Sequence, residues 1–342
     1  MDKPDFLIYS AFGSKHLDYD CVRIFFTGEN VRPDFNIADY AISAFDFMDA
    51  NDRYLRSGTY IGYDSEKHAA TLGKKREKFC CFLVTNGSLV NSKPQMRDRF
   101  YDKLSAYKRI DSGGRWRNNI GHFVGDRYGD WGKTKAEWLA EYKFNLCFEN
   151  SSYPGYLTEK LFDAYMAGCI PIYWGDTSLR IGFANEQEKE YDSSDLNAID
   201  TRLPRISPHL LEYKINPKAF INAHNFVNLD ALVAEVRRID NDEAAYQAML
   251  NQPLFLEDFK SREFYEKKLL DFLLYIFNQS PRAAFRRGEG QHMDYAINDL
   301  RDAKNLRSEI QKLHDERGKF TADGRNIGLF ISKCQRKVRE FR

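Results

Sequence analysis

Short apolar runs alternate along the chain with longer stretches in which apolar residues recur every three or four positions. Runs of the first kind predict buried strands, and stretches of the second kind predict amphipathic helices. The predicted strands are 6–10, 23–27, 40–45, 79–85, 143–148, 170–174 and 220–222. The predicted helices are 95–107, 134–141, 159–167, 229–239, 243–250 and 262–277. Strands that alternate with helices in this way predict an α/β fold.

The stretch 142–176 predicts a complete strand–loop–helix–strand unit. Its first strand runs into a polar loop that carries Pro154 and Gly155, both of which favour turns. Thr158 is a suitable N-cap for the following helix, and Gly168 is a suitable stop. In open parallel sheets, ligands bind at the carboxyl edge, and a helix N-terminus there favours phosphate. This unit therefore predicts a phosphate-binding site in the loop and the first helical turn.

Composition and charge narrow the classes of function. The chain has 342 residues, enough for two domains, with 43% hydrophobic and 30% charged residues, as in soluble globular proteins. A net charge of +1 gives no overall attraction to nucleic acid. The six cysteines form no C-x-x-C or Cys/His cluster, so we expect free thiols in a reducing compartment and no metal site. The N-terminus has no signal-peptide pattern, and we expect a cytoplasmic protein.

Three kinds of residue are candidates for chemistry. Glu29 follows a predicted strand and a glycine, where a carboxylate can act as a general base. An arginine in the Gly/Arg-rich loop 111–131 can clamp phosphate, and Lys160 near a helix N-terminus can stabilise a diphosphate leaving group. Each also has a structural interpretation: a solvated glutamate, an interdomain salt bridge and a helix-surface lysine. Two D-x-D matches, at 18–20 and 240–242, are interpreted as surface features because 50 acidic residues make chance matches common.

Three longer motifs resemble one enzyme family. The donor-binding motif of the bacterial-type α1,3/4-fucosyltransferases, glycosyltransferase family 10, is similar to FNLCFENSSYPGYLTEKLFDAYMAGCIPIYWG. The family's acceptor-side motif is similar to FFTGENVRPDFNIADYAISAFDF, and its arginine loop is similar to SGGRWRNNIG. The resemblance implies an α/β fold with two Rossmann-like domains facing each other across a cleft (GT-B type). It also implies inverting transfer of L-fucose from GDP-β-L-fucose to an N-acetylglucosamine-containing, lactosamine-type glycan with α1,3 linkage.

The motifs carry residues whose roles the resemblance implies. Glu29 matches the general base that takes the proton of the acceptor hydroxyl. Arg117 and Lys160 match the cations that bind the donor phosphates, and Glu159 matches the acidic donor contact, where it would favour oxocarbenium-like charge. The remaining donor contacts are Asn150 and Tyr156. GDP-fucose is the donor substrate, no cofactor is required, and a divalent metal is at most stimulatory.

The resemblance also divides the chain. We expect an acceptor-side domain at 1–115, a GDP-fucose-binding domain at 116–278 and a charged helical tail at 279–342. The first domain is expected to be short at its N-terminus, and 180–213 is expected to be an insertion.

The tail carries two predictions of interaction. Residues 294–316 have a broken apolar stripe where some family members carry dimerising heptads, so this segment is the candidate for a dimer contact. The basic amphipathic end, 327–342, is the candidate for peripheral contact with an anionic inner membrane, and a solvated terminal helix is the alternative. We expect an enzyme of protein glycosylation or lipopolysaccharide biosynthesis. A non-catalytic nucleotide-sugar or glycan-binding protein of the same fold is the alternative, and the acceptor and the choice between 1,3 and 1,4 linkage stay open.

Overall fold

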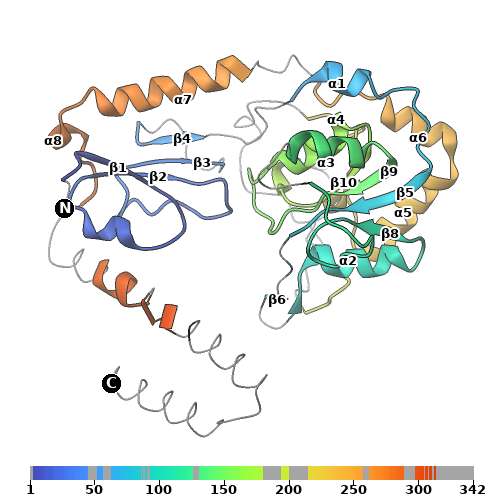
Figure 1. Cartoon of the computed structure of the whole chain (residues 1–342), viewed down its shortest axis with the longest axis horizontal. Coiled ribbons are helices and arrows are strands. Elements are labelled where there is room, and N and C mark those ends of the chain that lie inside the picture. The colour runs from blue at the N-terminus through green and yellow to red at the C-terminus, as the bar shows by residue number, and fades with distance from the viewer. Residues whose placement is uncertain are drawn as a thin grey trace, which may run out of the picture. The chain divides into compact units, whose positions relative to one another are not determined.

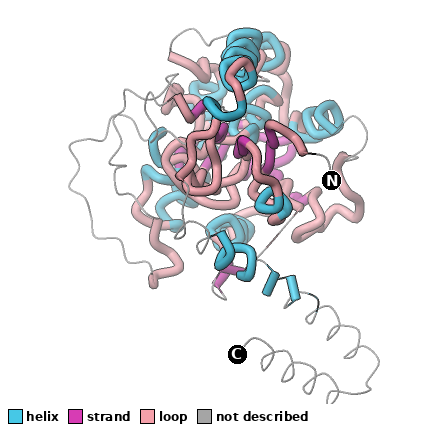
Figure 2. The backbone as a smooth tube through the Cα atoms, turned by 90° about the vertical axis from the view of Figure 1, so that its left-hand side faces the viewer, coloured by secondary structure: helices cyan, strands magenta, loops and turns pink. Residues whose placement is uncertain are grey.

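The chain forms two compact units. The computed structural model describes residues 3–44, 52–56, 63–85, 87, 89–90, 93–125, 131–179, 194–199, 215–256, 262–288, 297–303, 305–306, 308–309 and 312. The smaller unit comprises Met1–Phe26, Pro33–Ala41 and Ile276–Arg342, and the larger unit comprises Thr27–Arg32 and Ile42–Tyr275. Both units contain strands and helices (Figures 1 and 2).

The larger unit is built on a five-stranded sheet in the order β11-β10-β9-β5-β8. All four pairings in this sheet are parallel. Its strands are β5 (Lys78–Phe82), β8 (Ile110–Ser112), β9 (Tyr142–Leu146), β10 (Ile170–Tyr173) and β11 (Ile221–Asn222). Because parallel sheets are covered on both faces, their strands tend to read as continuous apolar runs, as β5 and β10 do, whereas β9 also carries Lys143 and Asn145.

Helices cover both faces of this sheet (Figure 1). They are α1 (Ser65–Ala69), α2 (Met96–Ser105), α3 (Trp131–Leu139), α4 (Glu159–Met166), α5 (Leu229–Asn241) and α6 (Glu243–Leu250). One apolar cluster joins α2, α5 and α6 to one face, which includes Cys80 and Phe82. A second cluster joins α3 and α4 to the other face, which includes Cys81. Neighbouring residues of β5 thus point alternately into the two clusters, as expected for a sheet that helices cover on both faces. The predicted α/β fold is confirmed.

The remaining elements are shorter or lie nearer the ends of the chain. They are β1 (Phe6–Tyr9), β2 (Val22–Phe26), β3 (Tyr40–Ser43) and β4 (Tyr54–Arg56) in a sheet of that order, the antiparallel pair β6 (Leu89–Val90) and β7 (Lys93–Pro94), α7 (Arg262–Phe277) and α8 (Pro281–Ala284). Each strand and helix predicted from the apolar pattern is present, with ends shifted by a few residues. The pattern did not predict α1, α8, β4, β8 or the β6–β7 pair, which are too short to give a periodic signal.

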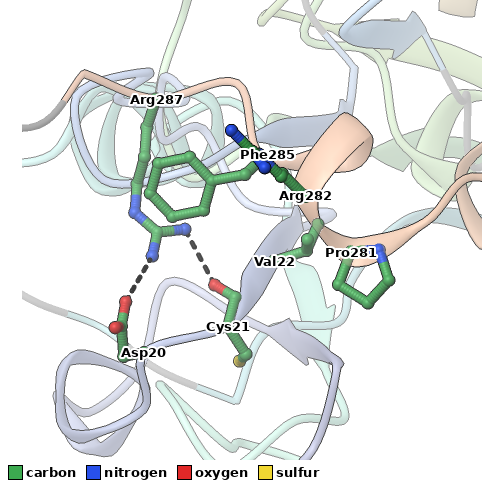
Figure 3. Close-up of a pocket in the computed structure, with 7 residues that line it drawn as sticks. All are labelled: Asp20, Cys21, Val22, Pro281, Arg282, Phe285 and Arg287. Atoms are coloured by element: carbon green, nitrogen blue, oxygen red, sulfur yellow. Dashed lines mark hydrogen bonds and ion pairs between the residues drawn. The ribbon is translucent and has the colours of Figure 1, made fainter.

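A buried ion pair closes the smaller unit. The Asp39 carboxylate, fully buried, accepts hydrogen bonds from the backbone N–H groups of Arg286 and Arg287 at 2.7 and 2.9 Å, and it pairs with the Arg287 guanidinium. Arg287 also donates to the Cys21 carbonyl at 2.8 Å and stacks over the Phe285 ring (Figure 3). These contacts attach the segment after α8 to the residues that directly precede β2 and β3.

The structure divides the chain elsewhere than near residue 115. β5, α2 and β8 precede that position, yet both strands pair within the larger sheet. The Gly/Arg-rich loop therefore does not link two domains. It folds back onto α2, where Trp116 Nε1 donates to Asp98 Oδ1 at 2.5 Å. Glycine and arginine content alone did not distinguish a linker from a loop that packs on its own unit.

Several predictions lie wholly or largely outside the described residues. The basic end at 327–342 is one, and most of the 180–213 insertion and much of 294–316 are the others. These stay predictions. Among the described helices, none is both long and apolar enough to cross a bilayer.

Candidate active site

The order of the strands identifies where a ligand would bind in the larger unit. From β5 the chain crosses to β8 at one edge, and it then returns to place β9 on the opposite side of β5. Such a reversal leaves a crevice at the carboxyl ends of the two central strands, where open parallel sheets bind ligands. Helices α2 and α4 follow β5 and β9 respectively, so both helix N-termini lie toward this edge. The N-terminal end of a helix favours phosphate through its free N–H groups and its dipole.

A buried carboxylate organises the start of α4. Glu149, three residues beyond β9 and fully buried, accepts a hydrogen bond from the Thr158 backbone N–H at 2.9 Å. The Thr158 hydroxyl lies 2.6 and 2.8 Å from the two carboxylate oxygens of Glu149. Thr158 is the N-cap residue of α4, as predicted, but its side chain makes no capping hydrogen bond. The buried carboxylate of Glu149 is the stronger acceptor, and the Thr158 hydroxyl donates its hydrogen bond to it.

Lys160 completes this cluster. Its Nζ atom lies 2.9 Å from Glu149 Oε2, 2.9 Å from Thr158 Oγ1 and 3.5 Å from Glu159 Oε1. Burial opposes the charge on Lys160, but Glu149 and Glu159 outweigh it and raise the lysine pKa. Burial raises the pKa of the Glu149 carboxyl, and Lys160 and Thr158 oppose that rise. The lysine is therefore a cation that is held in place, with 28% of its side chain exposed.

Glu159 lies on the solvent side of the same cluster. Its side chain is about half exposed at 48%. Burial of its carboxyl would raise the pKa, but Lys160 and Lys135 prevail and lower it, so Glu159 is a carboxylate at neutral pH. Lys135 comes from α3 and pairs with Asp163 of α4 at 2.7 Å. Lys135 and Lys160 both line a cavity of about 20 Å³, together with residues that follow β5 and β9. A cavity of that size has room for one water-sized molecule.

Tyr156 connects the predicted residues electrostatically. Burial raises the pKa of its phenol, and the charges of Glu149, Lys160, Glu29 and Glu159 act on it as well. The phenol, the lysine and the three carboxylates therefore share one electrostatic environment. Four of the six predicted site residues are among them.

Glu29 and Asn150 are in direct contact within the larger unit. Asn150 Nδ2 donates to Glu29 Oε2 at 3.1 Å, and the adjacent residues also pair, with Asn30 Nδ2 donating to Ser151 Oγ at 2.8 Å. Two segments that are about 120 residues apart in the chain thus meet at one loop. Glu29 is half-buried, so its carboxylate keeps an accessible side.

Two arginines compete for the role of phosphate ligand. Arg117 is the one non-glycine residue of the described chain with a positive φ, 56°, and its guanidinium is held by carboxylates of α2. It donates to Asp98 at 3.1 Å and to Asp102 at 3.0 Å. Arg97 is the second residue of α2, is buried, and interacts electrostatically with Asp98, Tyr156 and Glu149. The structure therefore places Arg97 in the environment of Tyr156, whereas Arg117 is paired with Asp98 and Asp102 of α2.

Three residues of this site were not among those predicted from the sequence. Glu149, Arg97 and Lys135 lie in segments that were assigned to a loop, a helix face and a short helix. Arg97 lies in the first turn of the helix that follows β5. A cation at that position could have been recognised from the sequence as a candidate phosphate ligand. Among the residues that the structure describes, no group of three or more His, Cys, Asp or Glu side chains could hold a metal ion.

A solved structure of known activity has the same fold. The crystal structure of an α1,3-fucosyltransferase with GDP-fucose matches with a TM-score of 0.53 and 28% identity, covering 79% of this chain and 78% of that chain. The fold defines the class of protein: it is the α/β fold of fucosyltransferase crystal structures of the GT-B type. Residues 1–63 match the family model of the α-(1,3)-fucosyltransferase FucT N-terminal domain, and residues 73–185 match that of glycosyltransferase family 10 (fucosyltransferase), C-terminal part. The chain belongs to the α1,3/4-fucosyltransferase family, glycosyltransferase family 10, as the motifs predicted.

Named relatives agree with this family. The α-(1,3)-fucosyltransferase FucT of Helicobacter pylori is 33% identical over 311 residues, which are 78% of this chain and 56% of that protein. The human 4-galactosyl-N-acetylglucosaminide 3-α-L-fucosyltransferase 9 is 27% identical over 154 residues, which are 44% of this chain and 37% of that protein. The chain thus spans little more than half the length of the bacterial relative.

Proposed function

We propose that this protein is an inverting α1,3-fucosyltransferase that moves L-fucose from GDP-β-L-fucose to a hydroxyl of an N-acetylglucosamine-containing glycan. One observation carries the proposal: Lys160 and Arg97 lie around Tyr156 and Glu149 at the carboxyl edge of the sheet, and Glu29 is joined to the same loop through Asn150. Cations for a diphosphate and a carboxylate for a hydroxyl proton are the groups that this transfer needs. The names of the relatives support the donor and the type of acceptor.

The leaving group sets the roles of the cations. Breaking the bond between fucose and phosphate increases negative charge on GDP, and fixed cations stabilise that charge most where water is excluded. Lys160 and Arg97 stand at the N-termini of α4 and α2, so the dipoles of the two helices add to their effect. Arg117 was predicted for this role, but two carboxylates already hold its guanidinium. We therefore assign the diphosphate to Arg97 and Lys160 first and keep Arg117 as the alternative.

The carboxylates act on the sugar and on the acceptor. Glu159 is ionised and half exposed beside Lys160, so it can stabilise the positive charge that develops on the fucose ring. Glu29 would accept the proton of the attacking hydroxyl, oriented by the Asn150 amide. Attack on the face opposite the departing diphosphate converts the β-linked donor to an α-linked product. Asn150 and Tyr156 would complete the donor contacts.

Labelled GDP-fucose with lactosamine as acceptor tests the proposal. We expect a fucosylated trisaccharide, with linkage analysis showing an α1,3 bond to N-acetylglucosamine. Tight binding of GDP-fucose with no acceptor-linked product, over a panel of lactosamine-type glycans, would instead identify a nucleotide-sugar-binding protein. Adding a chelator to the same reaction tests the prediction that no metal is required, because the rate should then be unchanged.

The tail predictions are part of the proposal. We propose that 294–316 contributes to a dimer and that 327–342 holds a cytoplasmic enzyme at an anionic inner membrane surface. Sedimentation of the full chain with vesicles that contain anionic lipid, compared with neutral vesicles, tests the second of these.

A further inference from the structure

We propose that Glu149 is a positioning residue of the donor site, which fixes Lys160 Nζ and the first turn of α4 before the diphosphate binds. The inference rests on the proposed function. Glu149 has no exposed surface, so its carboxylate does not touch the donor itself. It acts through Lys160 and Thr158, which it holds at 2.9 Å and at 2.6 to 2.8 Å.

The surroundings of Glu149 leave its side chain little freedom. Its backbone N–H donates to the Trp174 carbonyl at 2.8 Å, which continues the pairing of β9 with β10 beyond the ends of both strands. On the other side lies Gly175, where a Cβ atom would fall 2.4 Å from Glu149 Cγ and 2.6 Å from the Tyr173 hydroxyl. No side chain larger than hydrogen fits there, so the close approach of Gly175 keeps the carboxylate pointed at the start of α4.

The geometry of Lys160 shows what this placement achieves. An ammonium group has three N–H donors. One is directed to Glu149 and one to Thr158, and the third is on the side of Glu159, which is half exposed. A lysine side chain loses considerable rotamer freedom when it binds a ligand. Because Glu149 has already fixed the lysine, that cost is met in folding rather than when the donor binds.

The charges predict a specific kinetic signature. Glu149 has two opposite effects on the affinity for GDP: it spares the cost of fixing Lys160 when the donor binds, and its own negative charge weakens the attraction of Lys160 for the diphosphate. Its benefit is a cation at a fixed place when charge develops on the leaving diphosphate, and only interactions stronger in the transition state accelerate the reaction. Removing the charge of Glu149 should therefore lower kcat and leave the affinity for GDP nearly unchanged.

The first experiment is a double-mutant cycle with Glu149→Gln and Lys160→Ala on the full chain. In the wild-type background we expect Glu149→Gln to lower kcat about 100-fold, the loss typical of a small misplacement, with the Kd of GDP changed by less than about threefold. In the Lys160→Ala background the same substitution should change kcat by less than about threefold, because its target is gone. An equal loss in both backgrounds, or an unchanged kcat in the first, would overturn the proposal.

Asp240→Asn is the matched control, since it also removes a buried carboxylate that holds a lysine, Lys143. We expect it to leave kcat and the Kd of GDP unchanged. Should Glu149→Gln fail to fold, as judged by circular dichroism, Glu149→Asp replaces it in the cycle, because it keeps the charge but draws the carboxylate back by one methylene from Lys160 and Thr158.

A second readout does not depend on turnover. Glu149 raises the pKa of Lys160, so Glu149→Gln should increase the free-amine fraction and the rate at which Lys160 is acetylated by acetic anhydride. We expect an increase of about tenfold or more, which corresponds to one pKa unit, with Lys143 in the same digest unchanged. If the wild-type protein transfers no fucose, the proposed function fails, but this measurement still decides the inference: an unchanged rate at Lys160 refutes it.

Discussion

Two buried carboxylates of the larger unit, Glu149 and Asp240, hold lysines in opposite ways. Asp240 Oδ1 pairs with Lys143 at 2.9 Å, and Oδ2 accepts from Lys108 at 2.7 Å and from Tyr107 at 2.9 Å. Burial of Asp240 disfavours its charge, but the hydrogen bonds from Lys108 and Lys143 prevail and lower its pKa. For Glu149, burial prevails and raises the pKa despite Lys160.

The difference in pKa separates a carboxylate with a structural role, Asp240, from one that holds a lysine ready for a ligand, Glu149. Asp240 joins the end of α5 to β9 and to the end of α2, and its ionised form is fully supported by its partners. Glu149 lies at the carboxyl edge of the sheet, where a charged carboxylate is expensive and gives little stability. Proteins keep such expensive groups where function needs them. Asp240 is also the first residue of the D-x-D match at 240–242. Its side chain is only 2% exposed, so the interpretation of this match as a surface feature is wrong for Asp240.

The largest expected effect is that of replacing Glu29, the proposed general base. Glu29 contacts Asn150, the residue that follows Glu149. Glu29→Gln keeps the size of the side chain and removes its basicity, and a positioned general base contributes about 10²- to 10⁴-fold. We expect kcat to fall by about 10³-fold while GDP-fucose binding, followed by calorimetry, is retained. Turnover at the wild-type rate would exclude Glu29 as the base, and Glu66→Gln, an exposed glutamate of α1, is the control.

The paired substitutions Arg97→Ala and Arg117→Ala test which arginine belongs with the Glu149 cluster. Arg97 shares the environment of Tyr156 and Glu149, so its removal should weaken GDP binding by about 100-fold, as expected for a charge-assisted contact to phosphate. Arg117 is held by Asp98 and Asp102, so its removal should change the Kd by less than about threefold. Reversed results would return the phosphate role to Arg117.

The substitution Asp240→Asn tests the structural role of Asp240. Removing one partner of a buried ion pair leaves Lys143 without its charge partner, and we expect a loss of about 3 kcal/mol in the free energy of unfolding. Urea unfolding followed by circular dichroism measures this loss. The kcat of the folded fraction should match the wild type, and a large fall in kcat without loss of stability would break the comparison.

The smallest expected effect is on how the free energy of unfolding depends on pH, where Asp240 and Glu149 should act in opposite directions. The pKa of Asp240 is lowered in the folded state, so its contribution is present above its unfolded value of about 3.8 and is lost as the pH falls through the folded pKa. The pKa of Glu149 is raised, so the folded state binds its proton more tightly, and its contribution declines as the pH rises above about 4.5. Urea unfolding from pH 3 to pH 7 should show the stability difference between wild type and Asp240→Asn growing with pH. The difference between wild type and Glu149→Gln should shrink over the same range, and parallel slopes would contradict the distinction.

Much of the fold could be predicted from the sequence, because strands buried on both faces and long amphipathic helices leave clear apolar patterns. The domain boundary could not, since the pairing of β5 with β9 joins segments about 65 residues apart and depends on the whole sheet. The contact of Glu29 with Asn150 could be expected only through the family resemblance. Glu149 and Arg97 were not singled out, because a buried carboxylate after a strand and an arginine in a helix are recognised only when their partners are known.

Calorimetric titration with GDP tests the central claim, that the donor diphosphate binds at Lys160 on the carboxyl edge of the larger sheet. The comparison is between the wild type, Lys160→Ala and Lys143→Ala, two lysines that each pair with a buried carboxylate. We predict that Lys160→Ala weakens GDP binding by about 100-fold and that Lys143→Ala leaves it unchanged in the folded protein. Binding of GDP to Lys160→Ala with the wild-type affinity would contradict the account.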